Sequence, residues 1–202
     1  MTTPTPNSVL TEAIGPNSGA ALRAKELLLI VAGVAALAIT AKMRVPMWPV
    51  PITMQTFTVF VIGAAYGARL GVGTVLAYLA LGALGADVFT GSSATVGGLS
   101  YMAGPTGGYL AGFVVATAVV GALARRGWDR SVWRMAVAVA LGTATVYALG
   151  LGWMSVLFAG DKGMAWVLQY GMVNFLPGDA LKLALAATAV PAVVHLIGSR
   201  RA

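Results

Sequence analysis

The chain has 202 residues, of which 58% are hydrophobic and 9% charged, and its mean hydropathy is +0.85. A soluble globular domain carries about 25% charged residues, so these values exclude a protein whose surface faces water on all sides and predict an all-α integral membrane protein. The net charge of +7 comes from basic residues that stand singly or in pairs beside apolar stretches, and the sequence has no cysteine and one histidine, His195, which argues against a nucleic-acid surface, disulfides and a histidine or thiolate metal site.

A polar N-terminal segment is followed by six apolar stretches. Residues 1–21 are rich in Thr, Pro, Asn, Ser and Gly and predict a disordered tail, so a single transmembrane domain is predicted over residues 22–202. A helix of about 20 residues crosses the roughly 30 Å hydrocarbon layer of a membrane. On this basis six transmembrane helices are predicted, at residues 25–43, 53–68, 70–84, 106–124, 132–158 and 179–197.

Three interruptions between these helices have an unusual composition. Residues 45–52 contain three prolines, which deny a helix both hydrogen-bond donors and steric room and therefore predict an ordered loop. Residues 87–105 are rich in Gly, Ser and Thr, and Pro177-Gly178 interrupts the apolar run before the last helix.

The basic residues predict the orientation in the membrane. Six spans put both termini on one side, and placing them in the cytoplasm satisfies the excess of Lys and Arg expected in cytoplasmic loops. The cytoplasmic group then comprises Arg23, Lys25, Arg69, Arg125, Arg126, Arg130, Arg134, Arg200 and Arg201, against Lys42, Arg44 and Lys162 outside. The three interruptions face outward in this orientation, so we expect a site on the outer side.

Asp179 and Lys182, in the segment FLPGDALKL, are the strongest candidates for a site. Ionisable residues at membrane depth are rare and face the bundle interior, and residues three apart lie on one helix face. The pair therefore predicts an acceptor and a cation in one pocket. The alternative is that Asp179 caps the helix after Pro177-Gly178 and Lys182 neutralises it.

The proline-rich loop and the residues after it offer further candidates. Trp48 is a rigid apolar wall, and Thr53, Gln55 and Thr56 provide hydrogen-bonding groups, the combination found in pre-formed pockets. An interfacial aromatic position for Trp48 is the alternative. The segment GPTGGY, at residues 104–109, lacks the Gly-Lys-Ser/Thr of a phosphate loop, so it predicts a tight loop that brings Tyr109 close to a neighbour or a ligand.

Two further features bear on partners and on catalysis. Ala32, Gly33 and Ala36 have the small-residue spacing that permits close helix packing, within the bundle or to a partner subunit. No catalytic constellation is visible, because an intramembrane protease needs a Ser–His pair or two membrane aspartates and His195 lies at the end away from the outer motifs. An enzyme is therefore not expected.

Four motifs in order resemble the BioY family, the biotin-binding S components of energy-coupling factor (ECF) transporters. They are VPITMQTFTV at residues 50–59, YLALGALG at 78–85 with Phe89 after it, GPTGGYLAGF at 104–113 and FLPGDALKL at 175–183. The resemblance implies the ECF S-component fold in a bacterial cytoplasmic (inner) membrane, with six transmembrane helices and both termini cytoplasmic. It also implies a biotin pocket under the loop after the first helix, no cofactor, and energisation by a membrane coupling protein and two ABC-type ATPases that meet the face of Ala32 and Ala36.

Biotin combines an ureido ring, an apolar thioether and chain, and a carboxylate. We expect Asp179 to accept the ureido N–H groups, Lys182 to bind the carboxylate or the ureido oxygen, and Gln55 and Thr53 to complete the hydrogen bonds. The apolar wall is expected from Trp48, Phe89 and Tyr109. The alternatives are an S component for another vitamin, a stand-alone or proton-coupled carrier in which Asp179 titrates, and a structural membrane subunit that binds no small molecule.

Overall fold

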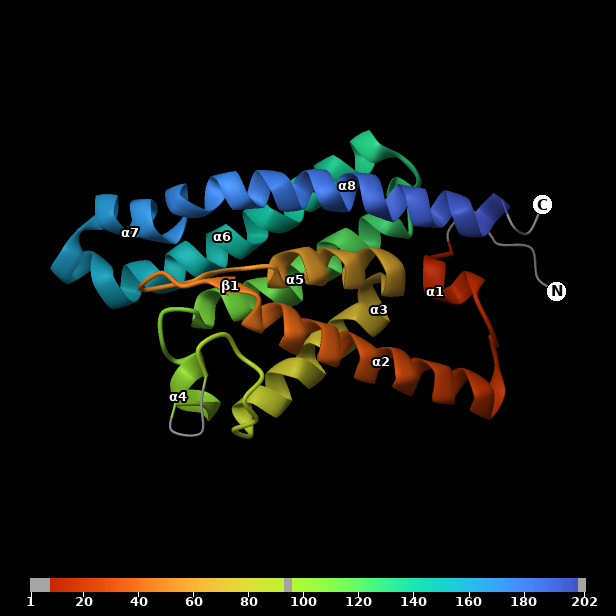
Figure 1. Cartoon of the computed structure of the whole chain (residues 1–202), viewed down its shortest axis with the longest axis horizontal. Coiled ribbons are helices and arrows are strands. Elements are labelled where there is room, and N and C mark those ends of the chain that lie inside the picture. Colours follow the sequence, from red (N-terminus) through yellow and green to blue (C-terminus); the bar gives the residue numbers. More distant parts are fainter. Residues whose placement is uncertain (1–7, 93–95, 200–202) are drawn as a thin grey trace.

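The computed structural model describes residues 8–92 and 96–199, which form an elongated helical bundle (Figure 1). The helices are α1 (Leu10–Ala13), α2 (Gly19–Lys42), α3 (Gln55–Ala83), α4 (Gly98–Met102), α5 (Gly107–Ala124), η1 (Trp128–Arg130), α6 (Val132–Lys162), α7 (Met164–Gly171), η2 (Val173–Phe175) and α8 (Leu176–Ser199). Strands β1 (Arg44–Val45) and β2 (Ile52–Thr53) form an antiparallel hairpin with Arg44 opposite Thr53.

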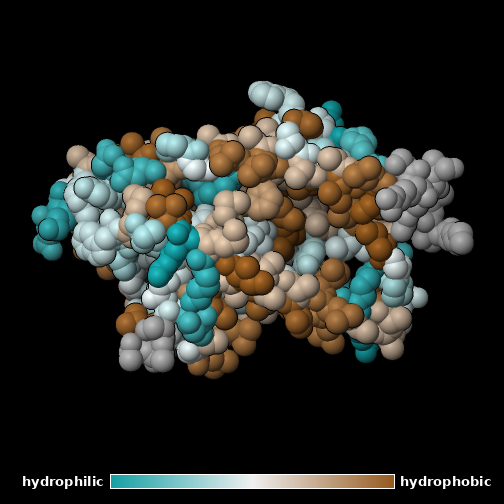
Figure 2. Space-filling view, in the orientation of Figure 1, coloured by the Kyte–Doolittle hydropathy of each residue, from teal (hydrophilic) through white to brown (hydrophobic). Residues whose placement is uncertain are grey.

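Five segments of the described chain are long and apolar enough to cross a membrane: Gly19–Lys42, Gln55–Ala83, Gly107–Ala124, Val132–Lys162 and Met164–Ile197. Figure 2 shows apolar residues over the middle of one face, with hydrophilic residues gathered toward the ends of the long axis. The chain is therefore a multi-pass membrane protein. Helix α5 is the most buried of these segments and α2 the least.

Helix α3 consists of two antiparallel halves that meet at Gly67. Gly67 has φ 74° and ψ 174°, a backbone conformation that favours glycine. The Nε2 atom of Gln55 lies 2.6 Å from the hydroxyl of Tyr78, although 23 residues of straight helix would separate them by about 35 Å. The two short helices predicted at residues 53–68 and 70–84 are these two halves.

Small residues bring α3 and α5 together backbone to backbone. A Cβ atom on Gly121 would lie 2.4 Å from the amide nitrogen of Ala68, and one on Gly63 would lie 3.0 Å from the carbonyl oxygen of Thr117. Close backbone approach is the usual basis of helix packing in lipid, because apolar side chains gain little there from avoiding the solvent. It makes α5 a central helix of the bundle.

The N-terminal segment differs from the predicted disordered tail at residues 1–21. Residues 1–7 lie outside the described residues, but α1 forms within that range and α2 begins at Gly19. Val9 is fully buried in the core, and Thr11 Oγ1 donates a hydrogen bond to the carbonyl of Ala65. The composition of the segment, which is mostly polar, gave no indication that Val9 would be buried.

The break before the last helix also lies elsewhere than predicted. Pro177 and Gly178 belong to the first turn of α8, where proline is tolerated because the first amide groups have no helical acceptor. The chain departs from helical geometry earlier, at Met172, with φ −139° and ψ −59°. Asp179 consequently lies inside the first turn of α8, near the positive end of the helix dipole.

Candidate functional site

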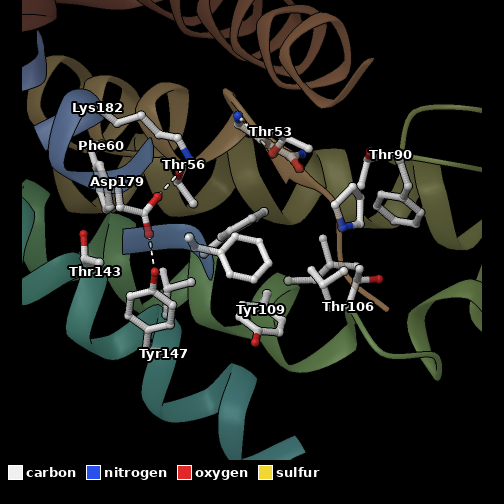
Figure 3. A pocket seen from close by; sticks show the side chains of 18 of the residues that line it. Thr53, Thr56, Phe60, Thr90, Thr106, Tyr109, Thr143, Tyr147, Asp179 and Lys182 are labelled. Carbon is white, nitrogen blue, oxygen red and sulfur yellow. Dashed lines mark hydrogen bonds and ion pairs between the residues drawn. The ribbon is translucent and has the colours of Figure 1, made fainter. Parts of the chain in front are cut away.

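A pocket lies at the end of the bundle that carries the β1–β2 hairpin, between that hairpin, α3, α5, α6 and α8 (Figure 3). It holds about 660 Å³ of empty space, including its open mouth, within the range of roughly 300–1,000 Å³ common for small-molecule sites. Its lining is mostly apolar and aromatic with a few polar groups: Val50, Pro51, Thr53, Gln55, Thr56, Phe60, Phe89, Thr90, Tyr101, Thr106, Tyr109, Leu110, Phe113, Thr143, Val146, Tyr147, Phe175, Asp179 and Lys182.

One end of the pocket holds a charged cluster built on α8. The ammonium of Lys182 lies 2.8 Å from Asp179 Oδ1 and donates a second hydrogen bond, 3.1 Å long, to Thr56 Oγ1. The hydroxyl of Tyr147, from α6, donates to the other carboxylate oxygen of Asp179. The side chains of Lys182 and Asp179 are 5% and 17% exposed, and buried charges of this kind are stable only when they are paired.

The opposite end of the pocket carries hydroxyl groups from the segment after α3. Figure 3 shows Thr90 and Thr106 across the cavity from Asp179 and Lys182. Within the described part of the chain, Thr90 Oγ1 is buried and has no hydrogen-bond partner, whereas the Thr90 carbonyl accepts a hydrogen bond from Tyr101. A buried polar atom without a partner is costly, so this hydroxyl is available for a ligand.

A network of hydrogen bonds fixes the backbone around Thr90. Lys42, at the end of α2, donates to Asp87 Oδ1 at 2.6 Å and to the carbonyl of Phe89 at 2.9 Å. Ser92 donates to the same two residues. The hydrogen bonds from Lys42 and then Ser92 hold the pKa of the Asp87 carboxyl below its usual range. The end of the pocket that carries Thr90 is therefore connected to α2 by the hydrogen bonds of Lys42.

Aromatic rings line the middle of the pocket and pack directly against glycines of neighbouring helices. Phe89 stacks on Tyr101 with ring centres 5.0 Å apart, and a Cβ on Gly82 would lie 2.0 Å from the Phe89 ring. Tyr109 packs over Gly150 in the same way and donates its hydroxyl to the carbonyl of Gly171 at 2.7 Å. The Tyr109 hydroxyl is thus used within the protein, and its ring serves as wall.

Gln55 and Thr53 border the pocket from the start of α3. Gln55 is buried, and its Nε2 donates to Tyr78, whose hydroxyl in turn donates to the carbonyl of Val88 at 3.0 Å. The backbone amide of Gln55 donates to Thr53 Oγ1. One side of the Gln55 amide is therefore already engaged in a chain that joins the two halves of α3 to the loop after them.

Six of the seven candidate residues from the sequence lie in the lining: Asp179, Lys182, Gln55, Thr53, Phe89 and Tyr109. Trp48 does not. It is 64% exposed and packs against Phe158 and Trp166, with ring centres 6.2 and 5.6 Å away. The hairpin turns Val50 and Pro51 into the pocket instead, so Trp48 anchors the hairpin and does not form the wall.

Tyr147 and Thr90, at the two ends of the pocket, were not among the residues predicted from the sequence. Tyr147 lies in the long apolar helix α6, two turns before Met154, with no motif around it. Its only sequence signal is that Thr143, Thr145 and Tyr147 are polar within an apolar span. Thr90 belongs to a loop whose composition marked it as irregular but gave no direction for any side chain.

On α2, Gly33 and the neighbouring alanines face different ways. Gly33 is buried, and a Cβ there would lie 2.5 Å from Thr74, so Gly33 serves packing within the bundle. Ala32 is exposed and Ala36 is half-buried. Packing within the described chain thus accounts for Gly33 and leaves Ala32 on the outer surface.

The chain matches the BioY family over residues 13–199. It is 35% identical over 178 residues to a protein of Pyrococcus horikoshii called a probable biotin transporter BioY, covering 88% of this chain and 99% of that one. It is 37% identical over 161 residues to the biotin transporter BioY of Thermotoga maritima, covering 79% and 90%. Among solved structures, the fold is similar to the S-component for biotin from an ECF-type ABC transporter, with a TM-score of 0.75, 24% identity, and coverage of 89% of this chain and 95% of that one.

Proposed function

The chain belongs to the BioY family, and from this we propose that it is the biotin-binding subunit of a vitamin uptake transporter, with no catalytic activity of its own. The observation that carries the proposal is the pocket with two unlike polar ends and an aromatic middle. Biotin has the same order of groups: an ureido ring, an apolar thioether and chain, and a carboxylate.

We propose that the ureido ring binds at Asp179 and Lys182. The cluster has no net charge and contains both acceptors and donors, which suits a neutral group that has two N–H donors and a carbonyl. Asp179 accepts the ureido N–H groups, and Lys182 donates to the ureido oxygen. A second carboxylate here would leave an uncompensated buried negative charge, which is strongly unfavourable.

The biotin carboxylate is then directed to the hydroxyl end. Thr90 Oγ1 is free to donate there, and the guanidinium of Arg44 lies beside the next residue, so that a Cβ on Gly91 would be 2.8 Å from it. A carboxylate at this position would be stabilised by the positive charge of Arg44 and by a hydrogen bond from the Thr90 hydroxyl. The rings of Phe89 and Tyr109 enclose the apolar part of biotin, and Gln55 and Thr53, which also line the pocket, complete the hydrogen bonds.

We further propose the membrane topology and the partners. The two halves of α3 together with α2, α5, α6 and α8 give six crossings of the bacterial cytoplasmic membrane, and both termini are cytoplasmic. The described chain ends, at α1 and the last turn of α8, lie at one end of the bundle (Figure 1), which supports this arrangement. A membrane coupling protein and two ABC-type ATPases supply the energy, and the coupling protein contacts the face of Ala32 and Ala36.

Equilibrium binding of biotin to the purified protein in detergent tests the proposal, with thiamine and riboflavin as matched controls. Saturable, biotin-selective binding is expected. Absence of binding by a monodisperse, helical sample would contradict the assignment. Uptake of labelled biotin by cells with and without the coupling subunits then separates the proposed energised transport from a stand-alone or proton-coupled carrier, which would need no such partner.

A further inference from the structure

Residues 8–14 fold against the end of the bundle where α3 turns at Gly67 and α5 ends at Ala124, away from the β1–β2 hairpin (Figure 1). Val9 is fully buried and seats on the turn of α3, because a Cβ on Gly67 would lie 3.3 Å from Val9 and equally close to the guanidinium of Arg125. Thr11 donates to the carbonyl of Ala65 at 3.0 Å, next to the same turn. The segment therefore packs against a specific site on the bundle, formed by the turn of α3 and the end of α5.

The same segment is fastened to α5 by an ion pair. Arg125, at the end of α5, donates to both carboxylate oxygens of Glu12, at 2.5 and 3.2 Å. The backbone amide of Val9 donates to Glu12 as well, at 3.4 Å. Both charged side chains are 45% exposed, so solvent screens the pair and its contribution is modest compared with a buried contact. The pair itself lies at the surface, outside the core that holds Val9.

The N-terminal half of α2 contacts this segment through Lys25. All the buried residues of α2, Gly33, Leu37 and Ala41, lie in its C-terminal half. In the N-terminal half, Lys25 donates to the carbonyls of Thr11 and Ile14 at 3.1 and 3.0 Å. Figure 1 shows the start of α2 standing apart from the other helices, connected to α1 by a short extended linker.

We propose that residues 8–14 form a clasp that holds the N-terminal half of α2 to α3 and α5, and that opening the Glu12–Arg125 pair lets this half of α2 swing away from the bundle. Val9, Thr11 and Glu12, which make the contacts of the clasp, precede the match to the BioY family, which begins at residue 13. The proposal does not depend on what the pocket binds.

Helix α2 is then held by hydrogen bonds near both of its ends, through Lys25 at the clasp and through Lys42 at its C-terminal end. At its other end Lys42 holds Asp87 and the carbonyl of Phe89, and the β1–β2 hairpin that follows supplies Val50 and Pro51 to the pocket. Between these ends, the C-terminal half of α2 packs on α3, where a Cβ on Gly33 would meet Thr74 and Thr58 donates a hydrogen bond to Thr40. The N-terminal half has no fully buried residue, so in the proposal the clasp sets the position of that half.

Distance measurements between spin labels test the proposal directly, and the absence of native cysteines makes the labelling simple. We would label the full chain at Ala24→Cys, on α2, and at Arg126→Cys, beyond α5; both side chains are exposed. The parent should give one narrow distance distribution. Glu12→Arg places two cations together and should broaden the distribution toward longer distances, whereas Glu12→Arg with Arg125→Glu rebuilds the pair and should restore it.

The matched control is Glu26→Arg, which makes the same change of charge at an exposed position of α2 that forms no ion pair in the described part of the chain. It should leave the distribution unchanged. Val9→Ala, which removes part of the buried anchor without a change of charge, should also broaden it. An unchanged distribution in Glu12→Arg, failure of the exchanged pair to restore it, or equal broadening by Glu26→Arg would each overturn the clasp.

Discussion

The ammonium of Lys182 lies 2.8 Å from the carboxylate of Asp179, three residues earlier on α8, and both side chains are largely buried. Burial leaves the two charges little contact with water, so each is stabilised by the other and by Thr56 and Tyr147. This arrangement makes the pair neutral as a whole while its individual atoms remain strong donors and acceptors.

Replacement of Lys182 by alanine should weaken biotin binding at least about tenfold, equivalent to roughly 1.4 kcal/mol. The change removes a donor to the ureido oxygen and leaves Asp179 without its cation. Isothermal titration in detergent measures the affinity, and Lys162→Ala, at the exposed C-terminal residue of α6, is the control. Unchanged affinity in a folded Lys182→Ala protein would remove this residue from the site.

Tyr147→Phe should lower biotin affinity by about three- to tenfold, equivalent to roughly 0.7–1.4 kcal/mol, because the lost hydroxyl donates to Asp179 and orients the carboxylate that receives the ligand. Tyr170→Phe is the matched control, since Tyr170 stacks on Trp166 outside the pocket lining. Equal affinities in the two variants would show that the orientation of Asp179 does not require the hydroxyl.

Gly82→Ala should destabilise the protein by roughly 1–3 kcal/mol, the usual cost of overpacking, and weaken biotin binding. The new methyl group would lie 2.0 Å from the ring of Phe89, which must leave its place in the pocket wall. Gly73→Ala, in the same half of α3 with no atom within 4 Å of the added Cβ, should be neutral or stabilising by up to about 1 kcal/mol. Thermal unfolding in detergent and biotin titration compare the two; similar behaviour would contradict the seating of Phe89 on Gly82.

Trp48→Ala should reduce biotin affinity less than Phe89→Ala does. Phe89 lines the pocket, whereas Trp48 is mostly exposed and contacts Phe158 and Trp166. The expected signature of Trp48→Ala is a faster release of biotin, because the hairpin that it anchors carries Val50 and Pro51. Stopped-flow displacement measures the release rate. A larger loss of affinity from Trp48→Ala than from Phe89→Ala would place Trp48 in direct contact with the ligand.

Much of this protein follows from local features of its sequence. Composition determined the membrane class, and four motifs determined the family, which the match over residues 13–199 confirms. The common face of Asp179 and Lys182 follows from the pitch of one helix, since residues three apart are neighbours on it. Prolines and glycines determined the loop at residues 45–52 and the separation of the two halves of α3 near Gly67, because these residues act on the backbone at their own position.

Only the tertiary structure decided which side chains meet in the pocket. In water, a helix reveals its inner face by the alternation of apolar and polar residues. In lipid the outer face is apolar too, so α6 gives no sign that Tyr147 points inward toward Asp179. The same holds for Trp48, which is equally suited to a pocket wall or to the outer aromatic cluster, and for Val9, a single apolar residue whose burial depends on a seat made by Gly67 and Arg125. These contacts join residues far apart in the chain, and their partners exist only once the helices have packed.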